Sequence, residues 1–312
     1  MERTGDQSPA EPRMSVSQYE GQTLPGESLL VRYVNLVKLP HTVFALPFAL
    51  LGVVYASRSS SVSFVQVALV LTAFTTARFA AMGFNRIVDR TIDSRNPRTK
   101  ARELPTGKLS LLQAAAATAT AAVMFLSCAA ALNRLCLWLS PLALAWILGY
   151  SYTKRFTSWS HLWLGGALAI APIGGFLAIA GVWSSPWWTL AALGLSVLTW
   201  VGGFDIFYAL QDENFDRNHD LKSAVVLLGQ SRAIQLGKVL HGITLLGLLS
   251  FGVGAGLGWP YFVGAALAAG LLAWEHQLVR VGDLGRLDAA FFRMNGIISI
   301  IVLLGALADR LL

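Results

Sequence analysis

The chain has 312 residues, of which 55% are hydrophobic and 13% are charged, and its formal net charge is +7 at pH 7. Soluble domains carry about 25% charged residues, so this composition excludes a soluble fold of this length. It predicts an all-α, multi-pass bundle of membrane-spanning helices. The two cysteines, Cys128 and Cys136, are too few for a disulfide framework, and we interpret both as small buried hydrophobic residues.

The first 28 residues are polar and contain no apolar segment of a signal peptide. We expect a disordered cytoplasmic tail over residues 1–28, followed by a single transmembrane domain over residues 29–312. One crossing needs about 20 apolar residues, and the chain has nine runs of this kind. They lie near residues 34–57, 62–84, 110–132, 135–153, 161–181, 187–208, 232–256, 258–279 and 290–311.

Lysine and arginine are distributed unevenly between the two sides of this topology. Most of the 24 basic residues fall in the N-terminal region and in the loops on the same side. The positive-inside rule places this side, and with it the N-terminus, in the cytoplasm. The tail lacks the Arg- and Ser-rich character of a transit peptide, so we expect a bacterial cytoplasmic membrane. The longer polar loops lie on the cytoplasmic side, where we therefore expect the active site.

An acidic cluster ends the second predicted span. Asn85, Asp89 and Asp93 are spaced by four residues, so on a helix their side chains share one face. Acidic residues are absent from the whole stretch between Glu27 and Asp89. Oxygen ligands on one face suit a hard divalent cation such as Mg²⁺.

A second acidic cluster ends the sixth predicted span. Asp205, Asp212, Asp216 and Asp220 are expected to lie along one helical stripe, at the same membrane side as the first cluster. Facing one another, the two clusters would hold two Mg²⁺ ions and a bridging diphosphate. The alternative is a set of solvated loop carboxylates, and for Asp220 a free surface acid explains the sequence equally well.

Basic residues accompany both clusters. Arg98 and Arg102 follow the first cluster, and Lys154–Arg155 form an isolated pair after the fourth span. Such cations would bind a diphosphate and stabilise it as it leaves, although positive-inside topology alone also places basic residues here. Arg78 lies inside the second span, where it would either bind an acidic substrate group or pair with a cluster aspartate.

These motifs are where the chain resembles the UbiA superfamily of intramembrane prenyltransferases. Residues 85–93 are similar to the NxxxDxxxD signature of that family, and residues 98–107 to its RT…RPLPxG continuation. Residues 150–157 look like its YxxxKRxT segment, and residues 205–216 look like its DxxYAxxDxxxD segment. Four motifs in the same order make the resemblance specific, and it extends over about residues 30–312.

The chain departs from the family at two positions and points to one branch of it. Asp220 stands where the family often has Gly, and Glu103 stands where it has Pro. Residues 38–48 and 291–296 resemble the bacterial branch of 4-hydroxybenzoate polyprenyltransferases. That branch also includes enzymes of the futalosine route to menaquinone, which prenylate an aminodeoxyfutalosine. The motifs do not separate these acceptors.

The resemblance implies a Mg²⁺-dependent transfer of a polyprenyl group from its diphosphate to a small aromatic acceptor in ubiquinone or menaquinone biosynthesis. The implied metal ligands are Asn85, Asp89, Asp93, Asp212 and Asp216. The implied diphosphate-binding residues are Arg98, Arg102, Lys154 and Arg155, of which Lys154, Arg155 and Arg102 also assist the departure of the diphosphate. Asp205 or Asp212 would orient the acceptor or take its proton. The candidate contacts to the acceptor are Arg78, His41, Tyr150 and Tyr208, although tyrosines at membrane ends are more often interface anchors.

An ion-coupled transporter is the alternative from another functional class, because intramembrane acids also mark ion pathways. Transporter sites usually lie near the middle of the bilayer, whereas both acidic clusters here end their spans on one side. We find no Gly-rich nucleotide loop, no haem attachment motif and no basic and aromatic surface for nucleic acid. The expected partners are therefore the two substrates and the lipid bilayer.

Overall fold

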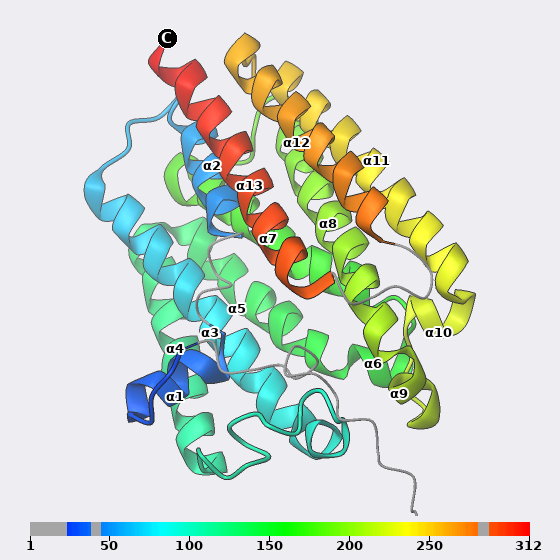
Figure 1. The fold of residues 1–312 in the computed structure, drawn as a ribbon. Helices are drawn as coiled ribbons and strands as arrows, with labels where there is room; N and C mark the ends of the chain where they lie inside the picture. Colours follow the sequence, from blue (N-terminus) through cyan, green and yellow to red (C-terminus); the bar gives the residue numbers. More distant parts are fainter. Residues whose placement is uncertain (1–23, 39–44, 280–286) are drawn as a thin grey trace, which may run out of the picture.

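The computed structural model describes residues 24–38, 45–279 and 287–312, with side chains of the last segment from Met294 onward. All regular structure in these residues is helical, which confirms the predicted all-α class (Figure 1). The long helices are α3 (Phe64–Arg95), α4 (Leu111–Leu132), α5 (Arg134–Gly149), α7 (Ser160–Ala180), α8 (Trp187–Ala209), α11 (Gln230–Gly254), α12 (Trp259–Leu278) and α13 (Leu287–Leu311). The short ones are α1 (Leu29–Leu36), α2 (Leu46–Ala56), η3 (Tyr150–Tyr152), α6 (Thr153–Phe156), η4 (Leu210–Asp212), α9 (Glu213–Asn218) and α10 (Ala224–Leu228).

Seven helical segments of the described residues are long and apolar enough to cross a membrane. They begin in α3, α4, α5, α7, α8, α11 and α13, and the segments that begin in α5 and α8 continue through the short helices that follow. Helix α12 has 20 residues but does not meet the same apolarity requirement. The count of nine spans therefore stays a prediction, while an integral membrane protein with several spans is supported.

The first predicted span, residues 34–57, is wrong as a single helix. Helix α1 ends at Leu36, and Lys38 has a backbone φ of 47°, which a continuing right-handed helix does not allow. Helix α2 starts afresh at Leu46 with a proline in its first turn. Its 11 residues reach only about 16 Å, which is short of a hydrocarbon core of about 30 Å. The predicted tail over residues 1–28 lies mostly outside the described residues.

Helix starts follow local capping chemistry. The side chains of Ser63 and Ser110 each accept a hydrogen bond from the backbone N–H of a glutamine three residues later, and Oε1 of that glutamine accepts one from the serine backbone N–H. These capping boxes satisfy amide groups that a helix start leaves without partners. They explain why α3 and α4 begin within two residues of the predicted boundaries.

The interior is built around α8, which packs against α7 on one side and α11 on the other. Helices α2 and α7 approach so closely that a Cβ at Gly52 would meet the backbone oxygen of Pro172. A Cβ at Gly175 would likewise meet the backbone oxygen of Ala49. Small residues let helix backbones touch in a membrane protein, where packing rather than water exclusion holds helices together.

The polar connections gather at one end of the bundle. Figure 1 shows α6, α9 and α10 at the end where α1 lies and where α4 begins, whereas the C-terminus lies at the opposite end. The long connection between α3 and α4 lies at the same end as α6 and α9. This arrangement brings both acidic clusters to one end of the molecule.

Candidate active site

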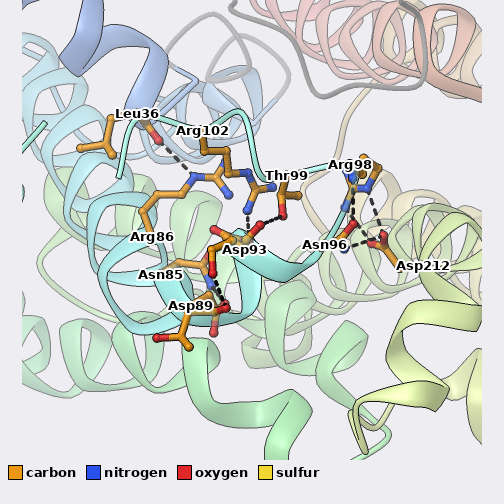
Figure 2. Close-up of polar contacts among 12 residues, drawn as sticks. Leu36, Asn85, Arg86, Asp89, Asp93, Asn96, Arg98, Thr99, Arg102 and Asp212 are labelled. Atoms are coloured by element: carbon orange, nitrogen blue, oxygen red, sulfur yellow. Dashed lines mark hydrogen bonds and ion pairs between the residues drawn. The ribbon is translucent and has the colours of Figure 1, made fainter. Parts of the chain in front are cut away.

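The first acidic cluster lies on the last turns of α3. Nδ2 of Asn85 donates to Oδ2 of Asp89 at 2.8 Å, so these two side chains share a face, as their spacing predicts (Figure 2). Asp93 is buried, and its Oδ1 accepts from Nη1 of Arg102 at 2.7 Å. Oδ2 of Asp93 is buried without a hydrogen-bond partner in the described part of the chain.

The second cluster does not continue along one α-helix. Helix α8 ends at Ala209 and gives way to the 3₁₀ turn η4 before α9 begins, so the predicted single stripe is wrong. The tighter 3₁₀ geometry changes the angle between successive residues. Asp212 and Asp216 are nevertheless both buried. Asp220 is exposed beyond the end of α9, in the left-handed backbone region with φ of 54°.

Each aspartate of the two clusters proposed as a metal ligand is paired with a predicted diphosphate-binding residue. Nε and Nη2 of Arg98 donate to the two carboxylate oxygens of Asp212, at 3.0 and 2.6 Å (Figure 2). Nη2 of Arg155 lies 3.2 Å from Oδ1 of Asp89, and Nζ of Lys154 lies 3.2 Å from Oδ2 of Asp216. The remaining pair is Asp93 with Arg102.

The Lys154–Arg155 pair connects the two clusters. Lys154 reaches Asp216 of α9, while its neighbour Arg155 reaches Asp89 of α3. Arg98, which follows α3 in the chain, bonds to Asp212 of the second cluster. The structure thus brings together the two clusters that lie more than 100 residues apart in the sequence, with basic side chains between them.

Three further polar residues belong to this end, and the sequence analysis did not single them out. Nδ2 of Asn96 lies 3.4 Å from Oδ1 of Asp212, and buried Arg86 donates to the backbone oxygen of Leu36 at 3.2 Å (Figure 2). Nδ1 of His161 lies 2.6 Å from Oδ2 of Asp205. His161 and Ser160 are the polar residues of an otherwise apolar α7, which is the signal that sequence reading could have used.

An apolar cavity of about 760 Å³ lies beside the clusters. It is lined by side chains of α2, α3, α4, α5, α7 and α8. Along α3 its lining runs from Val70 to Asn85, which corresponds to about 22 Å of helix. Asn85 belongs both to the lining and to the first cluster, so one end of the cavity borders that cluster. Its size lies within the range of pockets that bind small molecules.

The predicted acceptor contacts divide between the cavity and other places. Arg78 and Tyr150 line the cavity. Tyr150 also interacts electrostatically with Asp205 and with Asp89. Among the described residues Tyr208 is not part of the lining, although its hydroxyl is buried. His41 lies outside the described residues.

The donor groups fit Mg²⁺. No group of three or more His, Cys, Asp or Glu side chains close enough to enclose a metal occurs in the described ranges. Mg²⁺ is usually bound by one or two carboxylates together with substrate phosphates, so such an enclosure is not needed. Each cluster supplies two of the implied carboxylate ligands, and in the described part of the chain Oδ2 of Asp93 is a buried oxygen without a hydrogen-bond partner.

Comparison with known proteins gives one consistent result. The UbiA prenyltransferase family model matches residues 45–297. A 4-hydroxybenzoate octaprenyltransferase of Alcanivorax borkumensis is 29% identical over 250 residues, which cover 80% of this chain and 85% of the relative. One of Pseudomonas aeruginosa is 31% identical over 232 residues, which cover 74% of this chain and 77% of the relative.

Solved structures agree with the family model. The apo structure of a UbiA homolog from Aeropyrum pernix K1 has a TM-score of 0.79 at 32% identity, over 87% of this chain and 98% of that chain. A UbiA homolog from Archaeoglobus fulgidus bound to GPP and Mg²⁺ has a TM-score of 0.70 at 20% identity, over 90% of this chain and 100% of that chain. The second likeness shows a common fold.

Proposed function

The chain belongs to the UbiA prenyltransferase family, and we propose that it transfers a polyprenyl group from a polyprenyl diphosphate to 4-hydroxybenzoate or a related aromatic precursor of a quinone. The relatives named 4-hydroxybenzoate octaprenyltransferase support this choice of acceptor. The observation that carries the proposal is the meeting of two carboxylate clusters and four basic side chains at the polar end of an apolar cavity.

The cavity supplies the place for the donor. An isoprenoid chain is apolar and its diphosphate is highly charged, so a single molecule needs an apolar pocket that ends at cations. The lining from Val70 to Asn85 provides the first, and Lys154, Arg155 and Arg98 provide the second. These cations stabilise the charge that develops on the leaving oxygen when the allylic carbon–oxygen bond breaks.

Mg²⁺ would be held by Asn85, Asp89, Asp93, Asp212 and Asp216, and when bound it neutralises charge on the diphosphate oxygens. In the structure the carboxylates among these residues are paired with Lys and Arg side chains. We expect these side chains to turn from the carboxylates to the diphosphate when the ion and the donor bind. The GPP and Mg²⁺ of the Archaeoglobus fulgidus homolog support both partners.

The acceptor is expected next to the apolar cavity. The positive charge of Arg78 in the lining suits the carboxylate of 4-hydroxybenzoate. The ring carbon attacks the allylic carbon, a new carbon–carbon bond forms, and the ring carbon then loses its proton to a carboxylate. Asp205 or Asp212 is the candidate for this base. We place the reaction at the cytoplasmic face of a bacterial inner membrane, on the argument from basic residues alone.

The test is a product assay with purified protein in detergent, Mg²⁺ and an allylic diphosphate. 4-Hydroxybenzoate and aminodeoxyfutalosine are offered separately, with EDTA and Asp89→Asn as controls. Prenylated 4-hydroxybenzoate that disappears in both controls supports the proposal. Transfer to aminodeoxyfutalosine alone moves the enzyme to the futalosine route. No transfer to either acceptor by well-folded protein contradicts the proposed acceptor class.

A further inference from the structure

His161 is a buried histidine that the mechanism above does not use. It lies in the first turn of α7, and its side chain is 1% exposed. Its two ring nitrogens contact groups from two other elements. Nδ1 lies 2.6 Å from Oδ2 of Asp205 on α8, and Nε2 lies 3.3 Å from the backbone nitrogen of Ala224 in α10.

These two contacts determine which ring nitrogen carries the proton. The backbone nitrogen of Ala224 can only donate, so Nε2 of His161 must accept and carries no hydrogen. The neutral ring then has its hydrogen on Nδ1, which donates to Asp205. A second hydrogen on Nε2 would face the amide hydrogen of Ala224. The two contacts therefore fix the tautomer of the neutral ring, with the hydrogen on Nδ1 and directed at Asp205.

The backbone segment that donates to Nε2 of His161 is itself held in place by burial and hydrogen bonds. Ser223 and Ala224 are fully buried, and the Ser223 side chain caps the start of α10. The backbone nitrogen of Lys222 donates to the backbone oxygen of Lys154 at 2.7 Å. The segment that orients His161 is thereby attached to the segment that carries the Lys154–Arg155 pair.

Asp205 differs in its partner from the four aspartates proposed as metal ligands. Asp89, Asp93, Asp212 and Asp216 each form an ion pair with Lys or Arg, whereas in the described part of the chain Asp205 pairs with His161. The side chain of Asp205 is 20% exposed, so its carboxylate is accessible to a bound molecule. It interacts electrostatically with Tyr150 of the cavity lining and with Lys154. Asp205 thus lies near one residue of the cavity lining and one cation of the site.

We infer that His161 is a positioning residue that orients Asp205 as the carboxylate facing the aromatic acceptor, an inference that rests on the proposed function. Oδ2 of Asp205 accepts the hydrogen bond from Nδ1 of His161, which leaves Oδ1 for the acceptor. When the carbon–oxygen bond of the donor breaks and the new carbon–carbon bond forms, the proton of the attacked ring carbon goes to Oδ1. The hydrogen on Nδ1 of His161 stays in place.

The kinetic test compares His161→Ala, His161→Asn, Asp205→Asn and the double variant His161→Ala with Asp205→Asn. General base catalysis contributes about 10²–10⁴-fold, so loss of its orientation should lower kcat roughly 10–100-fold in His161→Ala. The KM for the donor should stay within about threefold, because the donor diphosphate contacts other residues. The Asn side chain places an N–H near the position of Nδ1, so His161→Asn should recover most of kcat.

The double variant should be no slower than Asp205→Asn, because His161 acts through Asp205. His241→Asn is the control, since His241 is a buried histidine of α11 that bonds to Trp200 and His276. Unchanged kcat in His161→Ala, or losses that multiply in the double variant, would overturn the inference. If the wild-type protein transfers no prenyl group to any acceptor, the proposed function has failed instead.

A spectroscopic measurement tests His161 without turnover. In protein labelled with ¹⁵N-histidine, His161→Asn identifies the His161 signals. The inference requires a protonated Nδ1 and an unprotonated Nε2, with an Nδ1 signal that moves in Asp205→Asn. A protonated Nε2, or an Nδ1 signal that does not change in Asp205→Asn, would overturn the inference whatever the activity assays show.

Discussion

Replacing Arg98 with Ala should strengthen the binding of Mg²⁺ alone and weaken the binding of the polyprenyl diphosphate. Arg98 occupies both carboxylate oxygens of Asp212 and therefore competes with a metal ion there. A hydrogen bond to a charged group contributes about 1.5–3 kcal/mol, and the lower end applies because the Arg98 side chain is 27% exposed. Each 1.4 kcal/mol corresponds to about tenfold in affinity, so Mg²⁺ should bind roughly tenfold more tightly to the variant.

Isothermal titration calorimetry in detergent measures the Mg²⁺ affinity, and steady-state assays at saturating Mg²⁺ give the KM for the donor. The matched control is Arg217→Ala, because Arg217 forms an ion pair with Glu213 at the same end of the bundle but is largely exposed. The control should change neither quantity. Weaker Mg²⁺ binding in Arg98→Ala would refute the competition, and an unchanged donor KM would refute a role of Arg98 in holding the diphosphate.

Three other substitutions test separate parts of the account. Gly174→Leu should lower the turnover of long-chain donors more than that of a short allylic diphosphate, because Gly174 lines the cavity and has open space at its Cβ position. The measurement is a pair of turnover assays, one with each donor. The control is Gly242→Leu, because Gly242 also has open space at its Cβ position but is not part of the cavity lining. Asp220→Gly should leave kcat unchanged and alter the free energy of unfolding by no more than about 1 kcal/mol, since Gly tolerates the left-handed backbone there; a large loss of kcat would make Asp220 part of the site. Gly52→Val should lower the free energy of unfolding by about 1–3 kcal/mol through overpacking against Pro172, and so lower the unfolding temperature, whereas Gly270→Ala in open space should not.

The sequence predicted α4, α7, α8, α11 and α12 to within two residues at both ends, because a membrane crossing imposes both a length and an apolar composition. It failed for residues 34–57, since the apolar run continues past Lys38 while the backbone there turns left-handed. A change of backbone conformation at one residue leaves the apolar pattern unchanged, so hydropathy alone does not record it. The departure at Asp220 has a local explanation, because a position with positive φ favours the Gly that the family often has.

Spacing alone predicted that Asn85 and Asp89 share a face, and their 2.8 Å contact agrees. It did not predict the pairing of Asp212 with Arg98, because helical spacing says nothing about which distant segments meet. His161 was missed for a related reason. A single histidine in an apolar helix is equally compatible with a core position, and only its contacts with Asp205 and Ala224 distinguish it.

The most direct test of the central claim follows the donor carbon itself. An allylic diphosphate labelled with ¹³C at the carbon that bears oxygen is incubated with the protein, Mg²⁺ and 4-hydroxybenzoate, and carbon and phosphorus NMR are recorded together. The account predicts that the labelled signal moves from an oxygen-bound to a carbon-bound position while an equal amount of inorganic diphosphate appears, both only with Mg²⁺. A well-folded protein that leaves the labelled donor unchanged would contradict it.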